Sequence, residues 1–368
     1  MKQFFIIAFV FMCLISCGKK ETFIPRDFNN VEIKRMLDTT SKITSSRAIE
    51  ISNGRIWFAG SDGLTGNWDL LDYDKSVIES KVFKHREQIT HNYTGTIFRQ
   101  SKSDTFGYEI RAVAKINDVF FTLTAGSPAI LTKYDSVRKF VYEENHPKAF
   151  YDSMDFWNDE EGIAIGDSTD GCLSVIITRD GGETWNKLSC DDLPKGIEGE
   201  GAFAASDTNI AIVGDNTWVA TTAGRIYYSG DKGNSWEVFD TPIVKEKETE
   251  GIYSIDFYDE LNGFAIGGDY TKPDDNAANK IRTTDGGKTW ELVAQNQNPG
   301  YRSCVQYIPN REGKELVAIG FNGIDYSNDT GTTWKHLSDE GFYTIRFLND
   351  SVAYAAGAGR ISKLTFRE

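Results

Sequence analysis

The sequence predicts an all-β protein, a seven-bladed β-propeller of four-stranded antiparallel blades. Its main support is a pattern, Ser/Thr-x-Asp-x-Gly-x-x-Trp, that occurs four times with its Trp residues 51, 54 and 44 positions apart. Segments of alternating apolar and polar residues, rich in β-branched side chains, precede these occurrences and are separated by Gly and Asp. Self-similarity with a period of roughly 40–50 residues is typical of propellers.

The four repeats are interpreted as hairpin turns with an internal clasp. Asp accepts hydrogen bonds from nearby backbone N–H groups, Gly takes the positive φ that the turn needs, and Trp buries a large ring between neighbouring sheets. The residues assigned this structural role are Asp180, Gly182, Trp185, Asp231, Gly233, Trp236, Asp285, Gly287, Trp290, Asp329, Gly331 and Trp334. A metal-binding or catalytic role for these Asp residues is the alternative.

Seven blades follow from seven expected innermost strands. These strands are expected to begin near Arg47, Arg111, Ser153, Phe203, Ser254, Ser303 and Thr344. The last repeat lacks a Trp-bearing strand, which would leave an open sheet edge. Residues 31–37 are the natural donor, so we expect them to close the ring as the outer strand of the final blade. The propeller then spans residues 31–368, with an extended hairpin or insertion expected within residues 85–104.

The N-terminus has the features of an export signal. Lys2 precedes an apolar run of eleven residues, 4–14, which is too short to span a bilayer but suits a signal peptide. The run ends in Leu-Ile-Ser-Cys, which resembles a bacterial lipobox, so residues 1–17 are predicted to be a lipoprotein signal peptide ending at an acylated Cys17. An ordinary signal peptide with a chance Cys is the alternative. Residues 18–30 are interpreted as a polar tether.

This interpretation places the protein in the cell envelope, anchored to a membrane through lipid and either periplasmic or surface-exposed. Export also permits disulfides. Cys172 and Cys190 flank the turn at residues 178–185 almost symmetrically, so we expect them to form a cross-strand disulfide. Two unpaired thiols are the alternative.

Composition excludes several classes of function. The net charge of −14 disfavours nucleic-acid binding. No metal and no cofactor are expected, because there is no nucleotide-binding βαβ unit and no phosphate-cradling loop. The four His residues, at positions 85, 91, 146 and 336, also have no metal-ligand spacing. A monomeric propeller is the expected state.

Three patterns are expected on the upper face of the ring, opposite the Asp-containing turns, where propellers usually meet their ligands. Gly-Asp ends the second strand three times, Glu-Gly precedes the inner strand three times, and Arg or Tyr recurs at one inner-strand position. The candidate binding residues are Asp167, Asp215, Asp269, Glu200, Glu250, Glu340, Arg47, Arg111, Arg302, Tyr253 and Tyr343. Ordinary turn chemistry and ion pairs within the ring are the alternative roles.

These residues also carry a family resemblance. Residues 47–51 (Arg-Ala-Ile-Glu-Ile), residues 56–60 (Ile-Trp-Phe-Ala-Gly) and the Thr-x-Asp-Gly-Gly-x-Thr-Trp strings resemble Asp-box, or BNR-repeat, propellers of the photosystem II assembly-factor type. More distantly they resemble sialidase and sortilin-type propellers. The resemblance implies seven blades and a scaffold or assembly role without cofactor chemistry. Because the motif also occurs in glycosidases, it specifies the fold better than the function.

Two functions remain open from the sequence. The first is a non-enzymatic binding, scaffold or assembly protein that meets a protein partner or a glycan on the upper face. The alternative is a glycoside hydrolase, sialidase-like or another carbohydrate-active enzyme, that uses upper-face carboxylates. A glycosidase needs two carboxylates roughly 5–10 Å apart, and no catalytic residue is assigned.

Overall fold

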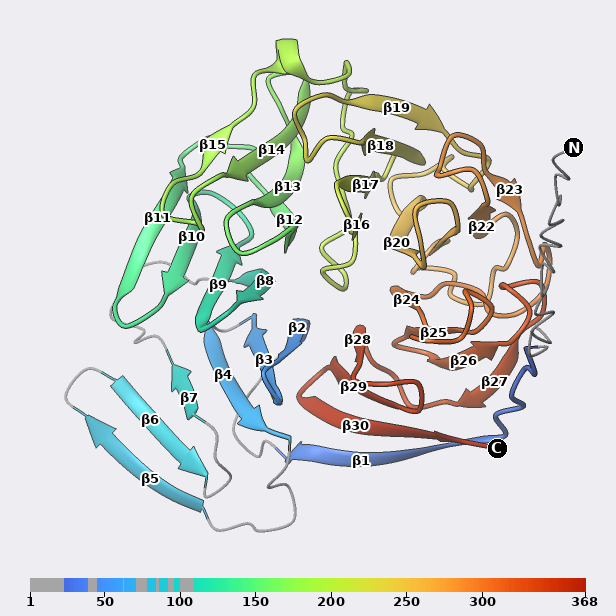
Figure 1. Ribbon diagram of the computed structural model, residues 1–368, viewed down its shortest axis with the longest axis horizontal. Helices are drawn as coiled ribbons and strands as arrows, with labels where there is room; N and C mark the ends of the chain where they lie inside the picture. Colours follow the sequence, from blue (N-terminus) through green and yellow to red (C-terminus); the bar gives the residue numbers. More distant parts are fainter. Residues whose placement is uncertain are drawn as a thin grey trace, which may run out of the picture.

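The computed structural model describes residues 23–38, 45–61, 63–70, 78–83, 86–91, 96–99 and 109–368. These residues form seven antiparallel sheets arranged in a ring (Figure 1), which confirms the expected seven-bladed propeller. Their only helical element is a 3-10 turn at Cys190–Asp192. No helix within the described residues is long and apolar enough to span a bilayer. The expected signal peptide, including Cys17, lies outside the described residues.

The strands of each blade run from the innermost, at the channel, to the outermost, at the rim. Blade one holds β2 (Ser46–Ser52), β3 (Arg55–Gly60), β4 (Leu64–Asp69) and β7 (Thr96–Arg99). Blade two holds β8 (Ile110–Ile116), β9 (Val119–Thr124), β10 (Ala129–Tyr134) and β11 (Arg138–Glu144). Blade three holds β12 (Tyr151–Phe156), β13 (Gly162–Thr169), β14 (Cys172–Thr178) and β15 (Asn186–Lys187). Blade four holds β16 (Ile210–Val213), β17 (Asn216–Ala220), β18 (Arg225–Ser229) and β19 (Glu237–Asp240).

The remaining three blades follow the same plan. Blade five holds β20 (Ile252–Phe257), β21 (Gly263–Gly267), β22 (Lys280–Thr283) and β23 (Glu291–Leu292). Blade six holds β24 (Cys304–Tyr307), β25 (Leu316–Gly320), β26 (Gly323–Ser327) and β27 (Lys335–Ser338). Blade seven holds β28 (Thr344–Phe347), β29 (Val352–Gly357), β30 (Arg360–Arg367) and β1 (Asn30–Asp38).

The N-terminal strand closes the ring as expected. β1 pairs antiparallel with β30, and Val31 lies opposite Phe366. This pairing covers the edge that blade seven would otherwise expose. The preceding residues, expected to belong to a polar tether, also join the fold: Phe28 is 1% exposed, and Arg26 forms an ion pair with Glu315 of blade six at 2.5 Å.

Blade one departs from the four-stranded plan. Beyond β7 its sheet continues into β6 (Arg86–His91) and β5 (Ile78–Phe83), giving six strands in the order β2-β3-β4-β7-β6-β5. The extra hairpin therefore starts earlier than the expected insertion at 85–104. It is the only sheet of the described chain that extends past a fourth strand.

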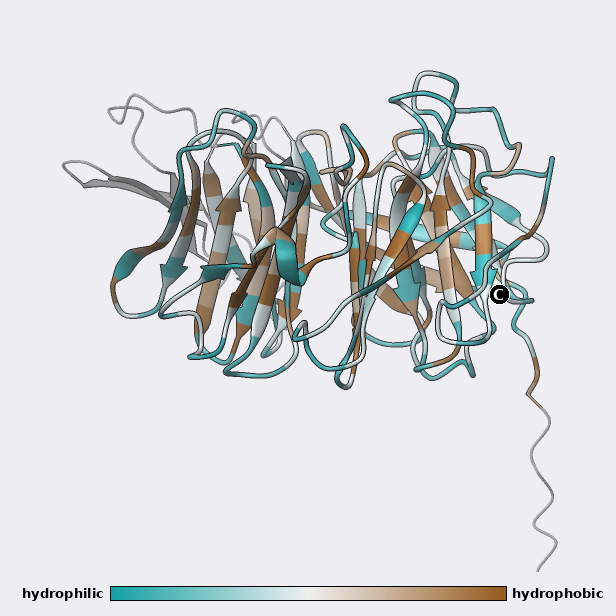
Figure 2. Cartoon of the chain, turned by 90° about the horizontal axis from the view of Figure 1, so that it is seen from above, coloured by the Kyte–Doolittle hydropathy of each residue, from teal (hydrophilic) through white to brown (hydrophobic). Residues whose placement is uncertain are grey.

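The apolar core lies between neighbouring blades. Viewed edge-on, the middle of the strands is hydrophobic and the turns on both faces are hydrophilic (Figure 2). One buried cluster joins Ile49 and Phe58 of blade one to Tyr354 of blade seven. Because each sheet is covered on both faces, its side chains contribute to two interfaces around the ring.

The four repeated turns, residues 178–185, 229–236, 283–290 and 327–334, are termed the Asp turns, and they share one set of hydrogen bonds. The first Ser or Thr donates its hydroxyl to Asp Oδ1 at 2.8–2.9 Å. The same hydroxyl accepts the Gly N–H at 2.7–3.0 Å. The Ser or Thr before Trp donates its N–H to Oδ1 and its hydroxyl to Oδ2. The Asp carboxylate thus serves as a clasp within the turn, which is the structural role predicted for it.

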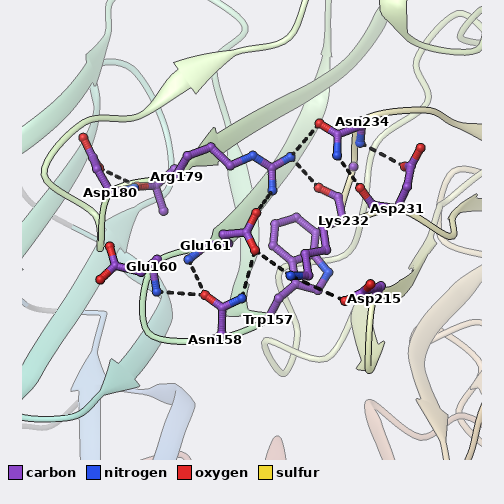
Figure 3. Close-up of polar contacts among 12 residues, drawn as sticks. Trp157, Asn158, Glu160, Glu161, Arg179, Asp180, Asp215, Asp231, Lys232 and Asn234 are labelled. Atoms are coloured by element: carbon purple, nitrogen blue, oxygen red, sulfur yellow. Dashed lines mark hydrogen bonds and ion pairs between the residues drawn. The ribbon is translucent and has the colours of Figure 1, made fainter.

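Each Asp turn is also bonded to the blade before it. The carbonyl of the residue after Asp accepts a hydrogen bond from Lys133, Arg179, Trp218 or Arg282, at 2.9, 2.6, 2.8 and 3.3 Å respectively. Figure 3 shows the contact between blades three and four. There Glu161 accepts hydrogen bonds from both Arg179 and Lys232, at 2.8 and 2.6 Å. The Asp turns therefore fasten successive blades together.

Two cysteines of blade three are joined in the structure. Cys172, at the start of β14, and Cys190 form a disulfide with Cα atoms 5.5 Å apart. It joins the expected pair, although Cys190 lies in the 3-10 turn after β15 rather than on the facing strand. Cys304 is a buried free thiol.

Candidate functional site

The two faces of the ring are defined by its turns. The lower face carries the Asp turns and the turns between first and second strands, because Gly181 N–H donates to Glu160 O at 2.9 Å and Gly286 N–H donates to Leu261 O at 3.0 Å. The upper face carries the connections from one blade to the next. One of these connections, leading to β16, enters the middle of the ring (Figure 1).

Residues 203–207 of that connection fill the upper part of the central channel, and we call them the plug. Thr344 of blade seven donates its hydroxyl to the carbonyl of Ser206 at 2.7 Å. Asp207 accepts the N–H of Val113 from blade two at 2.9 Å and that of Met154 from blade three at 3.1 Å. The plug therefore ties together blades that do not adjoin one another.

The plug corrects one sequence-based expectation. Phe203 was expected to begin the innermost strand of blade four, but that strand is β16, which begins at Ile210. As a consequence, Gly214 and Asp215 lie in the turn between β16 and β17. Asp215 thus lies on the lower face, 3.5 Å from Lys232 of an Asp turn, and not with the upper-face carboxylates (Figure 3).

Two arginines that were expected on the upper face lie together beside the plug. Arg47 donates to the carbonyl of Ala205 at 3.3 Å, and Arg111 donates to that of Ala204 at 3.0 Å. Burial and the neighbouring charge of Arg111 lower the pKa of Arg47. Among the described residues, the buried Nε atom of each arginine has no hydrogen-bond partner. Both guanidinium groups therefore retain unused donors.

Aromatic side chains surround these arginines. The guanidinium of Arg47 lies 4.1 Å from the ring centre of Tyr343. Phe203 of the plug stacks on Tyr253 with ring centres 3.7 Å apart, and Tyr253 meets Tyr301 edge-on at 4.7 Å. Two further rings are open to solvent, Tyr270 at 49% and Phe321 at 43% exposure. These side chains form what we call the upper patch, which comprises Arg47, Arg111, Phe203, Tyr253, Tyr270, Tyr301, Phe321 and Tyr343.

Arg302 does not belong to this patch, contrary to the expected repeat of Arg at one inner-strand position. Its side chain is buried and paired with Asp325 of β26 at 2.5 Å. The preceding residue, Tyr301, contacts Tyr253 and Phe321 instead. Tyr301 was missed because it lies in the connection before β24, which begins at Cys304, where the strand pattern gives no signal.

A second residue missed from the sequence is Asp152. The pairing register shifts on passing Arg47, Arg111, Asp152 and Tyr253, so these four occupy equivalent bulged positions in their blades. The sequence did offer a signal for Asp152, because it lies directly before Ser153, an expected strand start. Asp152 is 0% exposed, and neither of its carboxylate oxygens has a hydrogen-bond partner among the described residues.

Asp152 and the predicted Asp167 influence each other. Burial raises the pKa of Asp152 well above its usual value, the charge of Asp167 raises it further, and Arg111 opposes both effects. Burial also raises the pKa of Asp167 to about 6, against a hydrogen bond of 3.2 Å from the N–H of Ala202. Asp152 therefore lies near Arg111, and both carboxyl groups hold protons more readily than free Asp.

The other predicted carboxylates have partners within the ring. Glu200 is buried, forms an ion pair with Arg225 and accepts a hydrogen bond from Tyr227 at 3.0 Å. Glu250 pairs with Lys247 at 2.5 Å, and Glu340 pairs with Arg360. Asp269 accepts the N–H of Thr271 at 2.9 Å. In the structure these contacts make each of them a loop or blade anchor.

A cavity of about 520 Å³ lies on the lower face, where no ligand residues were expected. It is lined by the ends of β2, β20, β24 and β28 and by the turns that follow β20 and β24, and its polar residues include Glu50, Asp256, Gln306 and Arg346. Among the described residues no group of three His, Cys, Asp or Glu side chains is placed to hold a metal ion.

Solved structures with the same fold give context for this geometry. The chain matches no protein-family model and no curated protein. A structure described as YCF48 bound to D1 peptide is 13% identical, with a TM-score of 0.61, and the match covers 94% of this chain and all of that one. YCF48 from Cyanidioschyzon merolae is 11% identical, with a TM-score of 0.59 over 91% of this chain and 99% of that one. The WD40 repeats of RRP9 are 10% identical, with a TM-score of 0.61 over 94% and 100%. At these identities the similarity establishes the β-propeller fold and nothing finer.

Proposed function

We propose that this protein is a binding or scaffold protein that holds an acidic segment of a protein partner on the upper patch. The observation that carries the proposal is the pair Arg47 and Arg111, which lie half-buried beside the plug with an adjoining set of aromatic rings. Guanidinium groups bind carboxylates through paired hydrogen bonds, and Tyr rings supply contact area at low entropic cost.

The arginines favour an anionic ligand. In the structure Arg47 donates to the carbonyl of Ala205, and Arg111 donates to the carbonyl of Ala204 and to the side chain of Glu109. A carboxylate is a stronger acceptor than an amide carbonyl, because charge-assisted hydrogen bonds are about twice as strong as neutral ones. The two like charges also disfavour each other, as the lowered pKa of Arg47 reflects together with its burial. An anion bound between them would relieve that repulsion.

Similar folds support a peptide-binding role. One structural neighbour is described as bound to a peptide, and WD40 propellers are also among the neighbours. The glycosidase alternative is less well supported on the upper face, because Asp152 is fully buried and the expected carboxylates Glu200, Glu250 and Glu340 form ion pairs within the ring. Affinity capture with a glycan competitor distinguishes a glycan ligand from a protein partner.

We also propose that the protein acts at the cell envelope, anchored through an acylated Cys17. The apolar run 4–14 followed by Leu-Ile-Ser-Cys supports this location. Metabolic labelling with a radioactive fatty acid should label the native chain and not Cys17→Ala. An equally labelled Cys17→Ala variant would contradict the anchor without affecting the proposal for the upper patch.

The upper patch is tested by affinity capture from envelope extracts. The double variant Arg47→Ala/Arg111→Ala should lose a protein partner that the native chain retains. Arg367→Ala is the matched control, since this exposed arginine lies on β30 and pairs with Glu32 at the ring edge. Arg302→Ala is unsuitable, because it would leave buried Asp325 without its arginine. Equal capture by the double variant, or capture that a glycan competitor abolishes, would contradict the proposal.

A further inference from the structure

The cavity on the lower face, which we call the lower pocket, lies at the opposite end of the channel from the upper patch. Its volume is about 520 Å³, within the usual range for small-molecule sites. The lining side chains that matter most are Glu50, Asp256, Tyr258, Gln306, Tyr307 and Arg346. They come from blades one, five, six and seven, so the pocket lies where several inner strands end together.

The inner end of the lower pocket is formed by Arg346. Its Nη2 donates to the carbonyl of Asp207 in the plug at 3.0 Å, and its Nη1 donates to the hydroxyl of Thr344 at 2.9 Å. Its Nε donates to Glu50 at 3.3 Å. This arginine is thus engaged with the protein on three sides, and the plug lies directly behind it. A ligand entering from the lower face would meet a blind pocket.

The pocket carries an excess of negative charge. Glu50 and Asp256 line it, and Asp155 of β12 interacts electrostatically with both Glu50 and Arg346. Two carboxyl groups, Glu50 and Asp256, line the pocket with the single guanidinium of Arg346, so the lining is acidic when both are ionised. Burial raises the pKa of Asp256 to about 7, and burial also raises the pKa of Glu50, against the charge of Arg346. Asp207 behind the pocket also has a raised pKa, caused mainly by its burial.

Aromatic rings form a second, independent feature that favours cations. The rings of Tyr258 and Tyr307, two lining residues, meet edge-on with centres 5.9 Å apart. Phe257 and Phe347 also line the cavity, but their rings stack on Trp218 and Phe366. The faces of such rings attract ammonium groups, by about 0.5–2 kcal/mol depending on desolvation. Carboxylates together with aromatic walls are the chemistry by which proteins recognise organic ammonium ions.

We propose that the lower pocket binds a small organic cation carrying one or two ammonium groups. The carboxylates of Asp256 and Glu50 receive the ammonium groups, the ring of Tyr258 contacts the carbon chain, and Arg346 closes the inner end. Asp256 keeps acceptor capacity for this, because each of its oxygens accepts one backbone N–H, from Phe257 at 3.0 Å and Tyr307 at 2.6 Å. This site is separate from the upper patch and does not depend on its function.

The test is isothermal titration calorimetry of the whole protein with 1,4-diaminobutane, using 1,4-butanediol as the neutral control of equal length. The diamine should bind and the diol should not. A bound cation lowers the pKa of neighbouring carboxyl groups, so binding near pH 7 should release protons, detected as a heat that varies with the ionisation enthalpy of the buffer. Equal binding of diamine and diol, or no binding of either, would overturn the proposal.

Two variants locate the site. Asp256→Asn should weaken diamine binding by about tenfold or more, which corresponds to about 1.4 kcal/mol. Asp240→Asn, in an exposed position on β19, should leave binding unchanged. If Asp256→Asn fails to fold, Glu50→Gln serves in its place, because the described hydrogen bond of the Glu50 side chain comes from Arg346 at 3.3 Å and the amide oxygen can still accept it. Undiminished binding by the folded variant, or preference for a lysine-containing peptide over the free diamine, would refute the assignment.

Discussion

Gly331 of the fourth Asp turn offers the most direct test of how this fold is held together. Its φ is +78°, a conformation that a side-chain-bearing residue adopts only at a cost of about 1–2 kcal/mol. A Cβ atom built at this position would lie 2.1 Å from Cε2 of Phe264, which is fully buried in the preceding blade. Glycine is thus needed for two reasons, the backbone conformation and the close approach of the neighbouring blade.

Gly331→Ala should therefore carry both penalties. Forcing an extra carbon into a packed interior costs about 1–3 kcal/mol, so the total loss in unfolding free energy should be about 2–5 kcal/mol. Gly54→Ala is the matched control, since Gly54 has φ +69° but no described atom within 4 Å of the added carbon. That control should lose only the backbone part, about 1–2 kcal/mol.

Urea unfolding followed by tryptophan fluorescence measures both losses, provided that the slope against urea stays constant. Shortening the neighbouring ring separates the two penalties. In a Phe264→Leu background, Gly331→Ala should cost about the same as Gly54→Ala, because the clash has been removed. If Gly331→Ala costs no more than Gly54→Ala in the native background, the close approach between blades contributes nothing and the reasoning is wrong.

Three further predictions concern stability. Arg225→Met should lower the unfolding free energy by about 3–5 kcal/mol, because it leaves the fully buried carboxylate of Glu200 unpaired; a thermal unfolding temperature within a degree of the native value would contradict this. Replacing both Cys172 and Cys190 by Ser should lower the unfolding free energy by about 3 kcal/mol, as expected for opening a loop of 18 residues. In denaturant titrations with and without reductant, only the native chain should lose stability when the reductant is added. The pKa of Asp256 is raised by burial to about 7, so the folded state holds a proton that the unfolded state has already released above about pH 4. This group therefore lowers stability as pH rises from about 4 to 7, and Asp256→Asn should show a smaller loss of unfolding free energy between pH 5 and 8 than the native chain; identical pH profiles would show that Asp256 does not titrate in this range.

The parts of the fold that the sequence predicts well are those encoded locally. An Asp turn is complete within eight residues, and its hydrogen bonds join positions two to four apart, so the motif carries its own geometry. Ring closure was also predictable, because the last repeat lacks a strand and residues 31–37 supply one. Both predictions required only the recurrence of the motif and a count of the strands in each repeat.

The errors arose where distant parts of the chain decide the conformation. Residues 203–206 have the composition of a strand, yet they enter the channel because two arginines and the hydroxyl of Thr344, from other blades, donate to their carbonyls. Tyr301 and Arg302 precede β24, so contacts with other blades, and not strand pairing, decide which of the two side chains joins the upper patch. The lower pocket combines Glu50, Asp256 and Arg346 from three blades, a set for which no spacing in the sequence gives a signal.

The plug gives the two ends of the channel opposite chemistry. Its carbonyls at Ala204 and Ala205 face Arg111 and Arg47 on the upper side, and its carbonyl at Asp207 faces Arg346 on the lower side. At the lower end one arginine, Arg346, lies near Glu50, Asp155 and Asp256, whereas at the upper end two arginines lie near Glu109, Asp152 and Asp167, so the balance of charged groups is more negative at the lower end. A closed channel whose two ends differ in this way cannot serve as a pore for one kind of ion. It is suited instead to two separate ligands of opposite charge. The plug contacts the arginines of both sites and so holds both in place.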